Sequence, residues 1–163
     1  VMPAIAQEVL EIGPGGTGLL LLAVGLGSLF GNLILAGLGD FRRKAGLLMA
    51  SVLLQSVFLT LFAWSPWPWV SWVILLFVGA MSFGFFVPLV VTLIQLNVPP
   101  ELRGRVLSIL GLAPAVHYLG ALPLALAANA ISWPVAVTAG AALSMLVALW
   151  LGVWRPGLRR LAE

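Results

Sequence analysis

Long hydrophobic runs follow one another along the chain, and short segments between them carry most of the charged residues. A run of about 18 or more apolar residues is long enough to cross the hydrocarbon of a membrane as a helix. These runs lack the alternation of apolar and polar positions that marks the strands of a membrane β-barrel. We therefore predict an all-α, polytopic membrane protein whose full spans cover about residues 17–37, 45–64, 70–95, 105–128 and 134–154.

Residues 1–11 are also mostly apolar. At about 1.5 Å per residue, a helix of that length is too short to cross about 30 Å of hydrocarbon. We interpret the segment as the end of a truncated helix.

Composition supports a membrane fold. Hydrophobic residues make up 62% of the chain and charged residues 8%, whereas a soluble domain carries about 25% charged residues. An ordinary soluble globular fold is therefore excluded. The chain has no cysteine, which excludes disulfides, zinc-thiolate sites and a cysteine nucleophile. We expect no metal site and no cofactor.

The positions of the basic residues predict the orientation. When the predicted spans alternate across the bilayer, all eight Lys and Arg residues fall on one side, which the positive-inside rule assigns to the cytoplasm. We therefore place residues 38–44, 96–104 and 155–163 in the cytoplasm, and we expect an integral protein of the bacterial inner (plasma) membrane. The net charge of +3 then reflects this positive-inside topology. Membrane lipids are expected as partners, and nucleic acid is not.

Small residues recur every four positions in the first full span, at Ala23, Gly27 and Gly31. They form a stripe on one helix face, where the backbone of another helix can approach closely. Packing within the chain would explain this stripe. Association with a second chain would also explain it, and the protein would then be a small, non-catalytic membrane subunit.

Two loops carry motifs. The first reads Ala-Gly-Leu-Gly-Asp-Phe-Arg-Arg-Lys over residues 36–44, and the second reads Val-Pro-Pro-Glu-Leu-Arg-Gly-Arg-Val over residues 98–106. The first resembles the loop signature of the major facilitator superfamily, Gly-x-Leu-Ala-Asp-Arg-x-Gly-Arg-Lys, with departures at Ala36, Phe41 and Arg43. The second is similar to the stretch between the tenth and eleventh helices of drug and siderophore (enterobactin-type) exporters in that superfamily.

The resemblance covers residues 1–163 in order, from the end of the seventh helix through the twelfth. It implies the C-terminal six-helix half of a transporter, whose missing partner is the N-terminal half of the same transporter. It also implies transport of a small lipophilic or amphipathic molecule between the two halves by alternating access, with efflux as the expected direction. No enzymatic activity is expected.

The same resemblance implies a gating role for the two loops. In the superfamily the signature Asp pairs with a helix start in the opposite half, which implies that role for Asp40. A simpler interpretation also stands, because Glu101 favours the positive end of a helix dipole while Arg103 and Arg105 can contact lipid phosphates. The candidate gating residues are Asp40, Arg42, Arg43, Lys44, Glu101, Arg103, Gly104 and Arg105.

The resemblance also implies that the span at residues 70–95 is the cavity-lining tenth helix of the family. His117 is the ionisable residue at membrane depth in the span at residues 105–128, which makes it a functional candidate, although a neutral imidazole bonded to a neighbouring helix would be purely structural. The candidate cavity residues are Met81, Ser82, Phe85, Phe86, Thr92 and His117.

An intramembrane serine hydrolase is a remote alternative. Residues 80–84 read Ala-Met-Ser-Phe-Gly, one glycine short of a nucleophile-elbow pattern, and His117 would be the base for Ser82. We identify no catalytic residue beyond this weak match.

Overall fold

The computed structural model describes residues 14–39, 43–113, 115, 119–120, 123, 126, 128 and 131–154. All of the elements formed by these residues are helices. Among them, four segments are long and apolar enough to cross a membrane: Gly15–Gly37, Lys44–Ala63, Pro68–Asn97 and Trp133–Gly152. The prediction of an all-α, polytopic membrane fold is therefore confirmed. The predicted truncated helix at residues 1–11 lies outside the described residues.

The four long apolar helices follow the predicted spans closely, but one of them contains a segment that was not predicted. Their bounds are α2 (Pro14–Gly37), α3 (Lys44–Ala63), α4 (Pro68–Gly79), η1 (Ala80–Phe86), α5 (Val87–Asn97), α6 (Pro100–Leu110) and α8 (Trp133–Trp154). Because α4, η1 and α5 are continuous, they form one apolar helix of 30 residues. Its middle segment, η1, is a π-helix, which the hydrophobic pattern did not predict.

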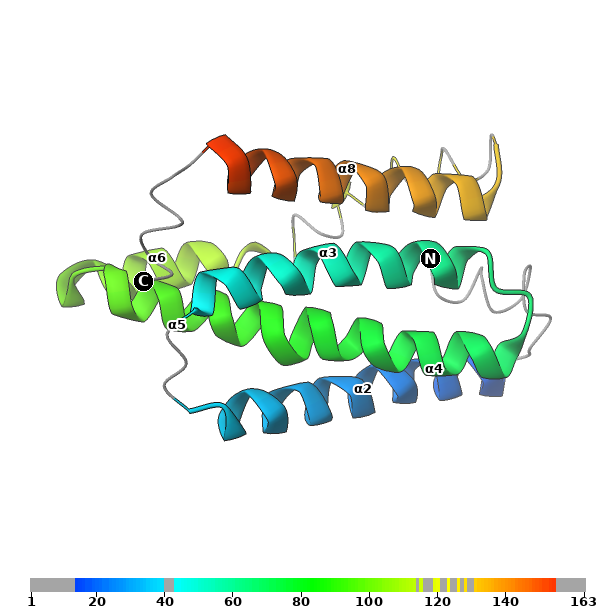
Figure 1. Cartoon of the computed structure of the whole chain (residues 1–163), viewed down its shortest axis with the longest axis horizontal. Coiled ribbons are helices and arrows are strands. Elements are labelled where there is room, and N and C mark those ends of the chain that lie inside the picture. The colour runs from blue at the N-terminus through cyan, green and yellow to red at the C-terminus, as the bar shows by residue number, and fades with distance from the viewer. Residues whose placement is uncertain are drawn as a thin grey trace.

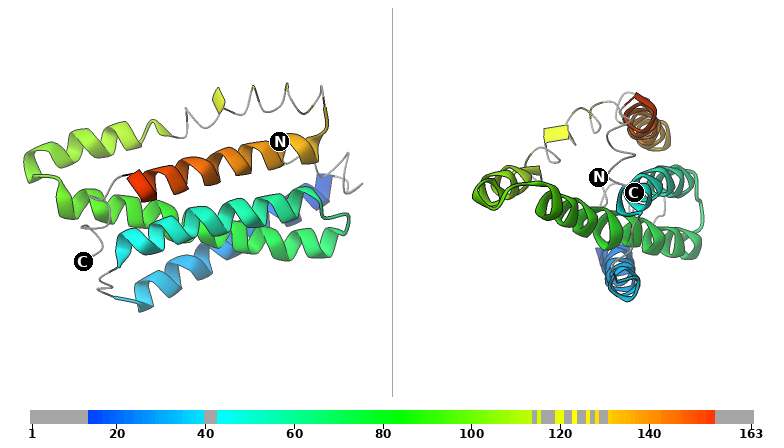
Figure 2. Two further views of the ribbon diagram at one scale, coloured as in Figure 1. Left: turned by 45° about the horizontal axis from the view of Figure 1, so that its top comes forward. Right: turned by 60° about the vertical axis from the view of Figure 1, so that its left-hand side comes forward.

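The long helices lie side by side in a bundle, as Figures 1 and 2 show. Helix α2 packs on α4 and η1, while α3 packs on α4 and η1 on one side and on α8 on another. The core of the bundle is hydrophobic, and its centre consists of Leu20, Ala23, Phe62, Leu75 and Val78.

Two indole groups tie neighbouring helices together. Trp72 on α4 donates its Nε1–H to the Leu19 carbonyl on α2 at 3.0 Å, and Trp64 after α3 donates to Thr138 Oγ1 on α8 at 3.0 Å. Both bonds lie where α2, α4 and α8 begin and α3 ends (Figure 1). They therefore strengthen one end of the bundle.

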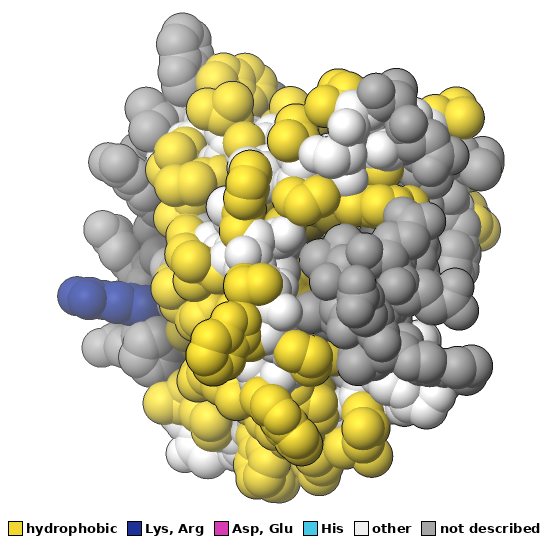
Figure 3. Space-filling model, turned by 90° about the vertical axis from the view of Figure 1, so that its right-hand side faces the viewer, with side chains coloured by type: hydrophobic (Ala, Val, Ile, Leu, Met, Phe, Trp, Pro, Cys, Tyr) yellow, Lys and Arg dark blue, Asp and Glu magenta, His cyan; other side chains and the backbone are white. Residues whose placement is uncertain are grey.

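The outer surface is mostly apolar. In Figure 3, hydrophobic side chains cover most of the described surface at the end of the bundle that holds the α3–α4 loop. Large side chains on the outer face of α2 are more than half exposed, among them Leu19, Phe30 and Leu33. Such a surface suits contact with lipid or with another apolar protein surface.

The predicted span at residues 105–128 begins earlier than expected. Its first part is α6, which starts at Pro100, and the α-helix stops at Leu110, with a turn at Gly111 and Leu112. Pro114 accounts for the stop, because proline has no N–H to donate to the Leu110 carbonyl four residues before it. Most of the remaining span, with His117, lies outside the described residues.

Candidate functional site

The two motif loops lie at the same end of the bundle. Helix α2 ends and α3 begins there, and the α5–α6 turn lies at this end as well (Figure 1). Arg43 and Lys44 are at the start of α3, and Glu101, Arg103 and Arg105 are on α6. All of the charged residues that the structure describes are therefore at this end. Asp40 and Arg42 lie outside the described residues.

The α5–α6 turn has a defined local structure. Pro99 precedes α6 with an extended backbone (φ −53°, ψ 145°), and Pro100 is the first helical residue, where its missing N–H leaves no bond unmade. Glu101 is in the first turn of α6, where a negative charge is favoured by the helix dipole. Arg103 donates its Nε–H to the Val98 carbonyl at 3.0 Å, which closes the turn.

Arg105 and Gly104 are exposed, whereas Arg103 is half-buried. The Nε–H of Arg103 is used within the turn, but its two terminal NH₂ groups still carry donors that suit a carboxylate. The turn thus presents two guanidinium groups next to the start of α6.

The α2–α3 loop begins at a glycine in a left-handed conformation. Gly39 has φ +57°, which a residue with a side chain adopts only at a cost. Its N–H bonds the Ala36 carbonyl at 3.3 Å, and Leu38 bonds Ile34 at 3.0 Å. Gly39 therefore follows the end of α2 in a conformation that cannot continue the helix.

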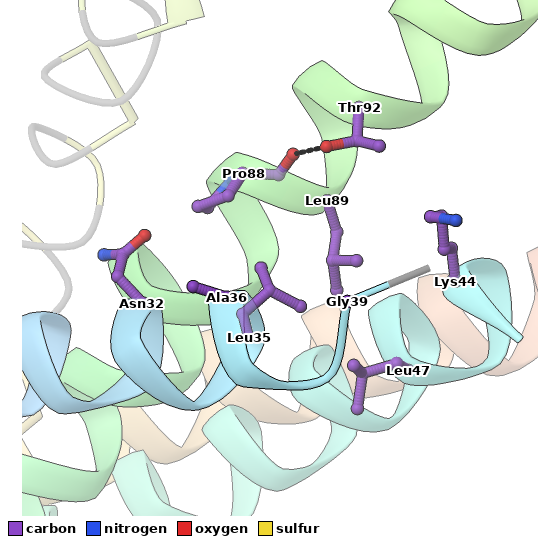
Figure 4. A pocket seen from close by; sticks show the side chains of 9 residues that line it. All are labelled: Asn32, Leu35, Ala36, Gly39, Lys44, Leu47, Pro88, Leu89 and Thr92. Atoms are coloured by element: carbon purple, nitrogen blue, oxygen red, sulfur yellow. Dashed lines mark hydrogen bonds between the residues drawn. The ribbon is translucent and has the colours of Figure 1, made fainter. Parts of the chain in front are cut away.

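A cavity of about 280 Å³ opens beside this loop. Thr92 and Lys44 are the two predicted site residues that reach it, and the Thr92 hydroxyl donates to the Pro88 carbonyl at 2.8 Å (Figure 4). Its other polar side chain is Asn32, and the rest of its wall is apolar. The residues that line it are Asn32, Leu35, Ala36, Gly39, Lys44, Leu47, Pro88, Leu89 and Thr92.

Four other predicted cavity residues, Met81, Ser82, Phe85 and Phe86, lie on η1 and do not line this cavity, and His117 lies outside the described residues. Met81 and Ser82 are half-buried, Phe85 is 7% exposed, and Phe86 is 36% exposed. The two phenylalanines therefore do not share one open wall, because Phe85 is packed inside the bundle. Ser82 is within a helix, so it lacks the strand-to-helix elbow that exposes a serine nucleophile.

The stripe of small residues on α2 faces the chain's own α4 and η1. Ala23 is fully buried, and a Cβ added to Gly27 would overlap the Leu76 carbonyl. A Cβ added to Gly31 would lie 2.8 Å from the Ala80 carbonyl oxygen. A second chain thus has no access to this face, and the idea of a small subunit that associates through it is wrong.

No metal centre is visible in the part of the chain that the structure describes, where no three His, Asp or Glu side chains form a group. The wall of the cavity is mostly apolar, and Lys44 contributes its ammonium group to it.

Sequence reasoning missed the link between Asn32 and the α4–η1–α5 helix. The Asn32 side chain donates from Nδ2 to the Ser28 carbonyl at 2.9 Å and to the Phe83 carbonyl at 3.3 Å. The sequence did contain a signal for this link, namely a polar residue, Asn32, within one apolar span and an internal proline, Pro88, within another.

Comparison with known proteins identifies the family. A family model described as Major Facilitator Superfamily matches residues 1–162. The comparisons with curated proteins and with solved structures gave no match. Members of this superfamily are membrane transporters rather than enzymes, in agreement with the long apolar helices. The chain therefore belongs to the major facilitator superfamily and is an integral membrane protein.

Proposed function

We propose that this chain is the C-terminal half of a larger permease, which exports a small lipophilic or amphipathic molecule by alternating access. The α5–α6 turn carries the proposal. Its Val-Pro-Pro-Glu-Leu-Arg-Gly-Arg-Val sequence resembles drug and siderophore exporters of the superfamily, and the turn presents Arg103 and Arg105 at the end of the bundle that also holds the α2–α3 loop.

Gating would use both loops. Asp40 would bind a helix start in the N-terminal half, with Arg42, Arg43 and Lys44 beside it, and Arg103 and Arg105 would receive an acidic residue from that half. The exposed position of Arg105 and the unused terminal NH₂ groups of Arg103 support this arrangement. These ion pairs would hold the cytoplasmic side closed.

The partner would be the N-terminal half of the same transporter. Met81, Ser82, Phe86, Thr92 and His117 are the candidates for lining the path between the halves. Phe85 is left out, because its ring is buried inside this half. The few hydroxyl groups among these residues fit an apolar substrate with few hydrogen-bonding groups.

The orientation follows from charge. We propose that the end with Arg43, Lys44, Arg103 and Arg105 faces the cytoplasm of a bacterial cell, because basic loops are retained on that side. Anionic lipid headgroups would then contact the same side chains.

A transport assay on the complete protein tests the proposal. Proteoliposomes that contain the complete protein should transport lipophilic fluorescent dyes faster than protein-free liposomes do. The variant Arg105→Ala should still insert into the membrane but lose most of this flux. Absence of flux for any dye would contradict the proposed substrate class. A stop codon shortly before Val1, with a membrane product of 17.2 kDa, would contradict the half-transporter.

A further inference from the structure

Pro88 interrupts the hydrogen bonds of the long α4–η1–α5 helix. In η1 the bonds join residues five apart, and the Val87 N–H donates to the Ser82 carbonyl in this way. The next donor in the same register would serve the Phe83 carbonyl. That donor would belong to residue 88, which is a proline and has no N–H. The helix itself therefore leaves the Phe83 carbonyl without this bond.

A side chain from another helix fills the gap. Asn32 on α2 donates from Nδ2 to the Phe83 carbonyl at 3.3 Å. Its second Nδ2 hydrogen bonds the Ser28 carbonyl at 2.9 Å in its own helix, which orients the amide toward η1. Both N–H groups of the side chain are thus engaged.

Glycines make this short reach possible. A Cβ added to Gly84 would lie 2.7 Å from the Gly31 Cα and 3.2 Å from the Ser28 carbonyl oxygen. Because neither Gly31 nor Gly84 has a side chain, α2 lies against η1 closely enough for an asparagine to bridge them. The π-helix contributes as well, since its five-residue register brings Gly79 and Gly84 to the same neighbouring helix.

We propose that Asn32 is a positioning residue that supplies, across the helix interface, the N–H that Pro88 lacks. By this bond it holds the junction between η1 and α5 against α2. Beyond the junction α5 packs on α3 and α6, and the 280 Å³ cavity lies between α2, α3 and α5. Loss of the bond would loosen α5 at Pro88 and change the shape of this cavity. The inference does not depend on the proposed substrate or on the missing half.

A double-mutant cycle tests the proposal in the full chain, reconstituted in lipid nanodiscs. Asn32→Leu should lower the midpoint of thermal unfolding by about 2–4 °C and should speed amide hydrogen exchange at residues 89–92 by on the order of five-fold. In Pro88→Ala the new N–H can serve the helix itself, so adding Asn32→Leu to that variant should produce little further change. Rescue by the proline substitution is specific to the proposed role.

Equal losses in both backgrounds would overturn the proposal, and so would the absence of any loss from Asn32→Leu in the background that keeps Pro88. Asn32→Met provides a second variant in case leucine disturbs folding, because the methionine thioether is uncharged and has no hydrogen to donate. It should behave as Asn32→Leu does, and full stability of Asn32→Met would also overturn the proposal. Asn97→Leu is the matched control, because the Asn97 amide donates to Leu93 within its own helix.

Discussion

Gly31 on α2 and Gly84 on η1 lie against each other with no side chain between their backbones. A Cβ on Gly84 would be 2.7 Å from the Gly31 Cα, and a Cβ on Gly31 would be 2.9 Å from the Gly84 Cα. Both values are shorter than the separation of two carbon atoms in contact. This pair therefore sets how closely the two helices approach.

The first prediction concerns this contact. Gly31→Ala should destabilise the protein by about 1–3 kcal/mol, because the added methyl group has to displace backbone of η1. Gly25→Ala on the same helix is the control, since a Cβ there meets nothing within 4 Å. It should be neutral or slightly stabilising, because alanine favours helix over glycine. Thermal unfolding in nanodiscs measures both, and equal effects would contradict the close approach at Gly31.

The second prediction concerns the indole bond between α4 and α2. Trp72→Phe should lower stability by about 0.5–1.5 kcal/mol, because the Leu19 carbonyl loses a donor while most of the aromatic surface is kept. Trp69→Phe is the matched control, since Trp69 is 81% exposed. Trp69→Phe should leave the midpoint of thermal unfolding unchanged. If both substitutions had the same effect, the indole bond would contribute nothing specific.

The third prediction concerns orientation in the membrane. Because the chain has no cysteine, a single introduced thiol can be labelled without background. Arg43→Cys should react with a membrane-impermeant reagent only from the cytoplasmic side, and Pro66→Cys only from outside. Both positions are exposed, whereas the neighbouring Ser65 is buried and would label poorly. The reverse pattern of labelling would invert the proposed topology.

The fourth prediction concerns the proposed gate. In the complete transporter, Asp40→Asn should reduce flux by about ten-fold or more, because a charge-assisted pair of about 1.5–3 kcal/mol is lost from one state only. Membrane abundance should change little, since Asp40 lies between two predicted spans of the sequence rather than within one. Dye flux normalised to the amount of protein measures the effect. Unchanged flux would remove the gating role from Asp40.

Sequence reasoning could predict the features that depend on length, composition and local chemistry. A long apolar run in a membrane has to become a helix, because no water is present to bond its backbone groups. The positions of α2, α3 and α8 follow from this constraint, and so does the continuous helix from Pro68 to Asn97. The start of α6 at Pro100 lies five residues before the predicted span, although the local properties of proline and Glu101 explain it.

The features that depend on contacts between distant segments could not be predicted from the sequence. The stripe at Gly27 and Gly31 predicted a close helix approach, but the sequence left open whether the partner was η1 or a second chain. The π-helix gave no periodic signal, since η1 is apolar throughout its seven residues apart from Ser82 and Gly84.

By itself, then, the sequence determined that the chain crosses a membrane as helices and that its described charges gather at one end. Both follow because the cost of burying polar backbone groups and charges acts on each segment separately. Only the tertiary structure decided which helix fills the glycine face of α2, where the π-helix begins, and which donor serves the Phe83 carbonyl. Each of these depends on two segments about 50 residues apart, and a hydrogen bond such as Asn32 to Phe83 exists only once both segments are in place.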